Sequence, residues 1–298
     1  MDKRIGLVGL DTSHAVAFAR NLNNAKDPEH VKGARVVVGL PGPSADFELS
    51  FGRVEKFTAE VRDQWGVKIV ESPEAVAEQC DVLFITSVDG RKHLDFVKRT
   101  AKFKKPTFVD KPMALTTADA KEMFRIAGET GYPLCSASAL RFADVLNEDL
   151  AKNTDTINGC DVYGPMQIQP TQPGFFWYGI HMAEIANRIM GVGCAEVSVA
   201  TNESCDLLNG VWKDGRMVSI RGMRKGHSRF GATIHREKDS VHLDLSACKK
   251  SYYASMLEDV LGGFERGRVA VEAADTLEIV RMLEAGNESR KTGKSVRL

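Results

Sequence analysis

The sequence has no Cys-x-x-Cys pair and no apolar run long enough to cross a membrane. Its six cysteines are scattered, which argues against a zinc site or a disulfide framework and is typical of a reducing compartment. Forty basic residues balance forty acidic ones, so no net field draws the chain to nucleic acid or to a membrane. A strand-like segment follows the first few residues without a secretory signal. We therefore expect a cytoplasmic protein with no metal site and no nucleic-acid or membrane partner.

The chain is long enough for two domains or for one large one. The 298 residues are 43% hydrophobic and 27% charged, as in ordinary globular proteins. Predicted strands and helices alternate as far as Leu134, which indicates a parallel sheet with right-handed crossovers. We therefore predict an α/β Rossmann-like, dinucleotide-binding domain over residues 1–141. An α+β domain with a largely antiparallel open sheet would follow over residues 142–298, with its C-terminal helices able to pack back on the first domain.

The antiparallel prediction depends on five strand-like runs separated by turn residues. Asn209-Gly210 and Asp214-Gly215 are typical hairpin turns, so we expect a meander. The runs cover residues 195–200, 207–212, 217–223, 230–236 and 241–245, and predicted helices cover 176–190, 252–267 and 271–293.

The turn after the first strand is an incomplete dinucleotide fingerprint. The fingerprint has glycine at positions 9, 11 and 14, but here Asp11 and His14 replace the second and third glycines. A carboxylate about 4 Å from a pyrophosphate charge would cost roughly 4 kcal/mol at an effective dielectric of about 20. Asp11 could instead cap the next helix, with Thr12 and Ser13 in its first turn and their hydroxyls near a phosphate. His14 either lies near the ligand or is simply packed.

The second strand, residues 33–40, lacks the acid that usually follows it in NAD-binding units. Pro41-Gly42-Pro43-Ser44 stands where a carboxylate would bind the ribose hydroxyls. The choice between NAD and NADP therefore stays open. Arg53 could meet a 2′-phosphate or could face solvent.

Two further strand exits carry polar residues. Ser87 through His93 follows the apolar strand 81–86, and Asp110-Lys111-Pro112 follows the strand 106–109. Ligands of open α/β sheets bind outside the carboxyl ends of the strands, so both exits point to one crevice. Pro112 biases the Lys111 backbone away from the helical region and so restricts where the Lys111 side chain can lie. The alternative is that Lys111 is a surface lysine.

A second chemical candidate lies on the helix predicted over residues 176–190. His181 and Glu184 are three residues apart, so they share a helix face and the carboxylate can favour the charged imidazole. Histidine is the side chain best suited to exchange protons near neutral pH. The alternative is a structural histidine packed among Trp177, Tyr178 and Met182.

The order of these motifs resembles the Gfo/Idh/MocA oxidoreductases, named for glucose–fructose oxidoreductase and inositol dehydrogenase. Asp110-Lys111-Pro112 is similar to the family's Glu-Lys-Pro, Arg141-Phe142 to its Arg-Phe, and Gly179-x-His181-x-x-Glu184 to its Gly-x-His-x-x-Asp. The resemblance runs nearly end to end. Its departures lie in the turn at Gly9 and in the segment after Leu40.

The resemblance implies hydride transfer between NAD or NADP and a carbinol carbon of a sugar, cyclitol or related polyol. Lys111 would bind the reacting oxygen and the nicotinamide end, His181 would exchange the hydroxyl proton, and Glu184 would orient a substrate hydroxyl or the histidine. Arg141 and Trp177 complete the expected substrate side. The expected cofactor contacts are Gly9, Asp11, Thr12, Ser13, His14, Ser87, His93, Asp110, Lys111 and Pro112.

The resemblance also implies a homo-oligomer, a dimer or a tetramer, formed through the antiparallel sheet. Two other functions remain open at this point. A tightly held dinucleotide could serve transient oxidation during elimination or glycoside cleavage. Alternatively, the protein could bind sugars without catalysis and have a degenerate cofactor site.

Overall fold

The computed structural model describes residues 2–298, which form two compact units. The first unit contains residues 2–114, Ala118–Ala137 and Tyr253–Ala273. The second contains Leu115–Thr117, Ser138–Tyr252 and Ala274–Leu298. The chain therefore enters the second unit after the sixth strand and returns to the first for one helix.

The first unit is built on a six-stranded sheet whose pairings are all parallel, as predicted. The strand order is β3-β2-β1-β4-β5-β6. The strands are β1 (Lys3–Val8), β2 (Ala34–Leu40), β3 (Lys68–Ile69), β4 (Val82–Ile85), β5 (Thr107–Asp110) and β6 (Leu134–Ala137). Val8 pairs with both Leu40 and Ile85, so the exits of β1, β2 and β4 lie at one edge of the sheet.

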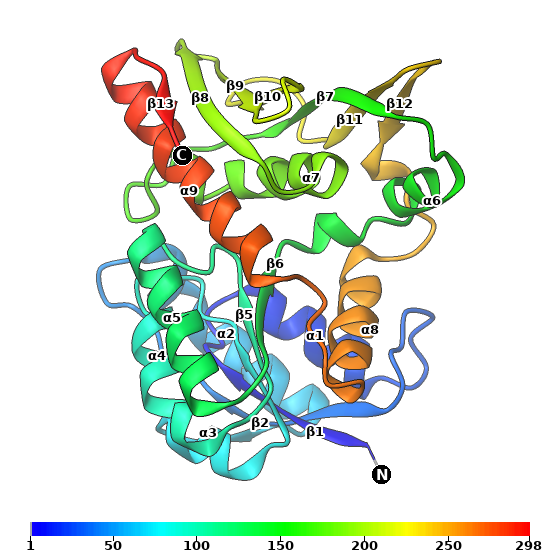
Figure 1. Ribbon diagram of the computed structural model, residues 1–298. Helices are drawn as coiled ribbons and strands as arrows, with labels where there is room; N and C mark the ends of the chain where they lie inside the picture. Colours follow the sequence, from blue (N-terminus) through cyan, green and yellow to red (C-terminus); the bar gives the residue numbers. More distant parts are fainter. Residues whose placement is uncertain (1) are drawn as a thin grey trace. The chain divides into compact units, whose positions relative to one another are not determined.

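Helices cover both faces of this sheet (Figure 1). They are α1 (Ser13–Asn23), α2 (Glu48–Trp65), α3 (Pro73–Gln79), α4 (His93–Thr100), α5 (Thr117–Thr130) and α8 (Tyr252–Glu265), with a 3-10 turn η1 (Ala101–Phe103). Phe18 of α1 makes edge contacts with Phe84, Phe108 and Tyr253. These aromatic rings join α1 to the sheet and to α8 in one core.

Local sequence explains where several helices begin and end. Ser72 accepts a hydrogen bond from the Ala75 amide at 3.1 Å and Pro73 opens α3, as the Ser-Pro-Glu pattern predicts. Helix α2 ends at Trp65, and the next residue, Gly66, has a left-handed φ of +66°, a conformation that glycine adopts without strain.

The second unit is built on a seven-stranded sheet in the order β12-β11-β7-β10-β9-β8-β13. Its strands are β7 (Ile157–Pro165), β8 (Cys194–Thr201), β9 (Cys205–Trp212), β10 (Met217–Met223), β11 (Gly231–Arg236), β12 (Ser240–Asp244) and β13 (Val296–Arg297). All pairings are antiparallel except that of β7 with β10. The largely antiparallel sheet is confirmed, but β7 lies between β10 and β11, so the predicted meander is interrupted there. Its two parts, β8 to β10 and the antiparallel pair of β11 and β12, follow the prediction.

Helix α7 (Gly179–Met190) packs against β7 and β10 on one face of this sheet (Figure 1). The unit also contains α6 (Asp144–Lys152), α9 (Ala273–Thr292) and the 3-10 turns η2 (Ala139–Phe142), η3 (Gly174–Phe176) and η4 (Leu245–Ala247). Along β10, Val218 and Ile220 are buried, whereas the Met217 side chain is 65% exposed. Because buried and exposed side chains alternate along the strand, the sheet has one apolar core face and one open face.

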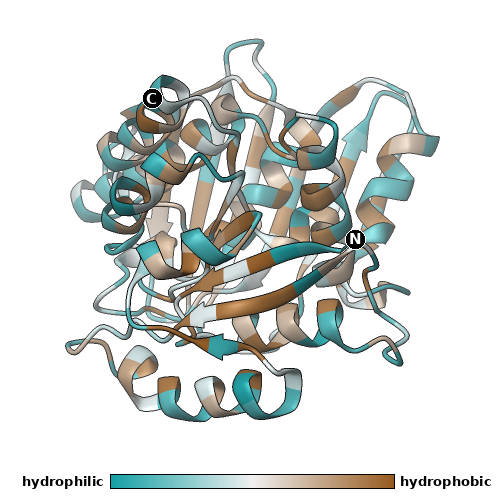
Figure 2. Cartoon of the chain, turned by 90° about the horizontal axis from the view of Figure 1, so that it is seen from below, coloured by the Kyte–Doolittle hydropathy of each residue, from teal (hydrophilic) through white to brown (hydrophobic). Residues whose placement is uncertain are grey.

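Hydrophobic residues concentrate in the strands, while the helices carry hydrophobic and hydrophilic residues in alternation (Figure 2). This is the pattern of helices packed on one side and wetted on the other. Among residues 2–298, no helix combines the length and the apolarity needed to span a bilayer.

Candidate functional site

The turn after β1 is packed directly on the exit of β4. Gly9 has φ of +104°, and a Cβ added there would lie 2.3 Å from the backbone nitrogen of Ser87. Only glycine fits such a conformation and such an approach. The Thr86 hydroxyl donates to the Gly9 carbonyl at 2.7 Å. The one glycine kept from the fingerprint therefore joins two neighbouring strand exits.

Asp11 does not cap the following helix, contrary to one expectation. Thr12 is the N-cap, and its hydroxyl oxygen accepts from the His14 amide at 3.3 Å. The Asp11 side chain is fully buried and accepts from the Ser50 hydroxyl at 2.5 Å and from the Val88 amide at 3.1 Å. Burial raises the pKa of Asp11, and these hydrogen bonds oppose the rise. The carboxylate is thus used inside the protein as a link between α2 and the exit of β4.

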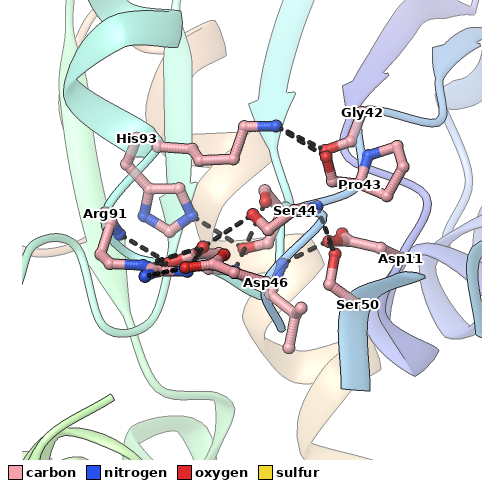
Figure 3. Close-up of polar contacts among 12 residues, drawn as sticks. Asp11, Gly42, Pro43, Ser44, Asp46, Ser50, Arg91 and His93 are labelled. Carbon is pink, nitrogen blue, oxygen red and sulfur yellow. Dashed lines mark hydrogen bonds and ion pairs between the residues drawn. The ribbon is translucent and has the colours of Figure 1, made fainter. Parts of the chain in front are cut away.

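This link continues through the loop after β2 (Figure 3). The Ser44 amide donates to Ser50 Oγ at 2.8 Å, and the Ser44 hydroxyl donates to Asp89 Oδ2 at 2.7 Å. Arg91 Nη2 lies 2.7 Å from Asp89 and 2.7 Å from Asp46. We call Asp11, Ser44, Asp46, Ser50, Asp89 and Arg91 the loop network. It holds together the loops that follow β1, β2 and β4.

Two further cations lie at this edge of the sheet. Lys92 Nζ donates to the carbonyls of Gly42 and Pro43 at 3.0 Å each. Arg53 Nη2 donates to the Asp11 carbonyl at 3.3 Å, so this half-buried arginine lies at the turn after β1 and not on a solvent-facing surface. The loop after β2 has no acid at its start, but it is braced by charged groups from the loop after β4.

His14 and Asp110, which are 96 residues apart, form a close pair. Nδ1 of His14 lies 2.5 Å from Asp110 Oδ2, and the Tyr253 ring contacts the imidazole edge-on at 5.1 Å. The Lys111 amide donates to Asp110 Oδ1 at 2.8 Å. Burial alone would raise the pKa of Asp110, but the charges of His14 and Lys111 with these hydrogen bonds bring it below its ordinary value. The structure thus brings His14, Asp110 and the Lys111 backbone together.

Lys111 stands at the end of β5 on a cis peptide bond to Pro112. Burial lowers the pKa of Lys111, the Asp110 charge opposes this, and the Arg53 charge adds to it. The fully buried His93 ring lies 3.0 Å from the Met113 carbonyl and 2.8 Å from the Ser87 carbonyl. His93 therefore joins the loop that carries Lys111 to the exit of β4.

The second unit holds the other predicted residues in a buried cluster around Arg141. Arg141 Nη1 lies 3.3 Å from Glu184 Oε2 and donates to Asn187 Oδ1 at 2.8 Å. Its Nη2 lies 3.2 Å from Asp275 Oδ1. Two carboxylates thus share one guanidinium. Burial raises the pKa of Glu184 to about 7 despite Arg141, and Asp275 adds to the rise.

His181 has a partner that sequence reasoning missed. Ser138 Oγ lies 2.6 Å from His181 Nδ1, and the Ser138 amide donates to Glu184 Oε1 at 3.0 Å. The rings of Tyr178 and Phe230 contact the imidazole edge-on at 5.4 and 5.5 Å, and the half-buried Trp177 packs on Tyr178 at 5.9 Å. The available signal for Ser138 was a hydroxyl directly after the sixth strand, where the chain leaves the sheet.

Comparison with known proteins identifies a family model and solved structures that this chain resembles. Residues 3–137 match the family model described as the oxidoreductase family with an NAD-binding Rossmann fold, Gfo/Idh/MocA. No match is found among curated protein sequences. Three similar solved structures show the same fold at low sequence identity.

A myo-inositol dehydrogenase from Lactobacillus casei, in complex with NAD(H) and myo-inositol, is 14% identical, with a TM-score of 0.77 over 100% of this chain and 97% of the other. A myo-inositol dehydrogenase from Corynebacterium glutamicum is 15% identical, with a TM-score of 0.78 over 100% and 99%. An oxidoreductase from Agrobacterium radiobacter, in complex with NAD⁺, L-tartaric acid and magnesium, is 17% identical, with a TM-score of 0.75 over 100% and 98%.

The fold and the match define a dinucleotide-binding oxidoreductase. Residues 3–137, somewhat less than half of the chain, match the model of the Gfo/Idh/MocA oxidoreductase family. The resemblance, the enzyme class and the expected cofactor, NAD or NADP, are thereby confirmed at the level of the family. Within residues 2–298, no group of three or more His, Cys, Asp or Glu side chains is placed to hold a metal ion.

Proposed function

We propose that the protein transfers hydride between NAD(P) and a carbinol carbon of a sugar, cyclitol or related polyol, with Lys111 and His181 as its polar and acid–base residues. The observation that carries the proposal is the position of Lys111 at the carboxyl end of β5. Burial lowers the pKa of Lys111, and its amide donates a hydrogen bond to the Asp110 carboxylate. Ligands of open α/β sheets bind at this edge.

The residues of the first unit fit a dinucleotide. The turn at Gly9 leads into the N-terminus of α1, whose first turn carries no acidic residue, and helix N-termini favour phosphate groups. The Asp11 carboxylate accepts hydrogen bonds from Ser50 and Val88, and Arg53 adds a cation at the Asp11 carbonyl. Ser13, His14 and Arg53 would hold the diphosphate end, and the nicotinamide, when bound, would exchange the hydride.

The proposed chemistry divides between two side chains. As hydride leaves a carbinol carbon, its oxygen gains alkoxide character, which the Lys111 ammonium would stabilise. His181 would take the hydroxyl proton, and a positioned acid–base group typically contributes about 10²–10⁴-fold to the rate. The Lactobacillus casei structure, solved with NAD(H) and myo-inositol, supports a polyol as the substrate class.

The same proposal includes a homo-oligomer formed through the open face of the second unit's sheet. Met217 and Val211, 65% and 39% exposed, are apolar side chains on that face. Sedimentation of the wild type and of Met217→Lys tests it. We expect the variant to dissociate, and a wild-type monomer at micromolar concentration would contradict the proposal.

The deciding experiment begins with calorimetric titration of NAD(H) and NADP(H) into protein checked for retained nucleotide. A screen of sugars and polyols with the cofactor that binds then identifies a substrate. We expect Lys111→Ala and His181→Ala each to lower kcat at least 100-fold, within the usual range for such groups, with the cofactor Kd changed only a few-fold. Lys102→Ala, on the exposed 3-10 turn after α4, is the matched control. Wild-type turnover in both site variants would reject the assignment.

A further inference from the structure

We infer that Ser138 is the positioning residue that sets the proton on His181, and that Glu184 and Arg141 act through Ser138 rather than on the substrate. The inference rests on the proposed function, because it assigns a partner to the proposed acid–base residue. None of the sequence motifs includes Ser138.

Ser138 contacts the His181 ring directly. Ser138 is fully buried, and its Oγ lies 2.6 Å from His181 Nδ1. The same oxygen accepts from the Leu140 amide at 3.3 Å. A hydroxyl has two acceptor lone pairs and one O–H, so Oγ can accept from Leu140 and either accept from Nδ1–H or donate its own proton to Nδ1. The inference is that Oγ accepts from Nδ1–H. The hydrogen bond at one ring nitrogen decides which nitrogen carries the proton.

When Oγ accepts from Nδ1–H, His181 has the tautomer that a base needs. With the proton held on Nδ1 by Ser138, proton exchange with a substrate hydroxyl would use Nε2. After Nε2 takes the proton, the imidazolium still donates from Nδ1 to the same Oγ. One contact therefore serves both protonation states, and no group has to move during the transfer. A hydroxyl also carries no charge, so it does not trap the imidazolium as a carboxylate would.

Ser138 is itself held in place by a buried ion pair. Its amide donates to Glu184 Oε1 at 3.0 Å, and Glu184 Oε2 lies 3.3 Å from Arg141 Nη1. Arg141 is fixed in turn by Asn187 at 2.8 Å and Asp275 at 3.2 Å. A buried ion pair contributes little net stability, because desolvation offsets its attraction. The pair of Glu184 and Arg141 is better explained by its effect on the main chain. It fixes the Ser138 amide, and from there the Ser138 side chain reaches His181.

The competing explanation is purely structural, because Ser138 also caps η2 through Leu140. Loss of a cap lowers stability but does not alter the titration of a histidine ring. The test is therefore NMR of the imidazole nitrogens in the full chain with ¹⁵N-labelled histidine, without substrate, with the His181 signals assigned from His181→Gln.

We expect the neutral His181 of the wild type to carry its proton on Nδ1. In Ser138→Ala this preference should be lost and the titration midpoint should shift, whereas Ser138→Thr, which keeps the hydroxyl, should restore both. Ser136→Ala removes a buried serine two residues earlier and should change neither. A wild-type tautomer and midpoint in Ser138→Ala would overturn the inference, as would an Nε2–H tautomer in the wild type.

Kinetics then separates this inference from the proposed function. With a proven substrate, Ser138→Ala should lower kcat about tenfold or more, shift the pH profile and leave KM nearly unchanged. If the NMR coupling is present but His181→Ala turns over like the wild type, the proposed function fails. If His181 is essential but Ser138→Ala leaves the ring and the pH profile unchanged, the inference on Ser138 alone fails.

Discussion

The two units treat a buried carboxylate in opposite ways. Asp110 in the first unit has a pKa below its ordinary value, whereas the pKa of Glu184 in the second is raised to about 7. Both side chains are almost completely shielded from solvent. Burial disfavours the charged form of each, so the difference has to come from their partners.

The number of acids that share each positive partner explains the contrast. Asp110 has the His14 ring at 2.5 Å, the Lys111 amide at 2.8 Å and the Lys111 charge nearby. Glu184 shares the one Arg141 guanidinium with Asp275. Asp110 has two positive partners and stays ionised. Glu184 and Asp275 share one cation, so the charged forms of both acids are harder to stabilise together. The comparison shows that burial raises the pKa of a carboxyl, and that the number of acids sharing each cation decides whether this rise is overcome.

The largest expected effect comes from removing the shared cation. Arg141→Met would leave Glu184 and Asp275 without their guanidinium, and breaking a buried ion pair by removing one partner typically costs about 3–5 kcal/mol. Urea unfolding at pH 7 measures this loss. Arg221→Met, an exposed arginine on β10, is the control, and its expected change lies within about 0.5 kcal/mol. Equal stability of Arg141→Met and the wild type would contradict the role given to Arg141.

The second prediction concerns the pH dependence due to Glu184. Its folded pKa of about 7 lies above its ordinary value of 4.5, so the folded state binds more protons between these two values. Stability relative to Glu184→Gln should therefore fall as pH rises from about 4.5 to 7, by about 3 kcal/mol for a shift of this size. Urea titrations of the two proteins across that range measure the difference.

Asp110→Asn provides the opposite slope and so sharpens the comparison. Because the pKa of Asp110 is lowered in the folded state, its contribution is present above the ordinary carboxyl pKa. That contribution is lost as pH falls through the lower folded value. Parallel slopes for the Glu184 and Asp110 variants would remove the contrast on which this explanation depends.

The third prediction concerns Asp11. In Asp11→Gly, the Ser50 hydroxyl and the Val88 amide lose their acceptor in a buried place, which costs about 1–3 kcal/mol. The three loops would also loosen, so we expect weaker binding of NAD(H) or NADP(H) by calorimetry. Ser50→Ala should share part of the loss, so that the double variant loses less than the sum. Tighter binding in Asp11→Gly would show instead that the carboxylate repels the cofactor.

Much of the fold follows from local patterns. The buried strands of the first unit are short apolar runs between helices, and β8, β9 and β10 are separated by turn residues, so the sequence predicts both groups. Strand β7 was missed because Ile157–Pro165 contains Gly159, Gly164 and Pro165 and an exposed Asp161. Its place between β10 and β11 depends on pairing with strands far along the chain, which periodicity does not report.

The sequence predicted several residues of the candidate site but not the residues that they contact. The strand exits select Asp11, His14 and Asp110 for attention, yet the pairing of His14 with Asp110 spans 96 residues. Similarly, Ser138 and His181 are 43 residues apart. The direction of the Asp11 carboxylate depends on where Ser50 of α2 packs. Such contacts are set by tertiary structure, so spacing along the chain could not supply them.

The smallest expected effect is at the edge of the loop network, where Arg91 joins two acids of different exposure. The Asp46 side chain is 68% exposed and the Asp89 side chain is 1% exposed, although each lies 2.7 Å from the same Arg91 nitrogen. Exposed ion pairs contribute little because water and salt screen them. Asp46→Asn should therefore leave the melting temperature nearly unchanged, whereas Asp89→Asn, which weakens buried bonds to Ser44 and Arg91, should lower it clearly. Thermal melts of both variants at low and high salt measure this, and equal losses would mean that the Arg91 pairs, not the buried bond to Ser44, hold the loop after β2.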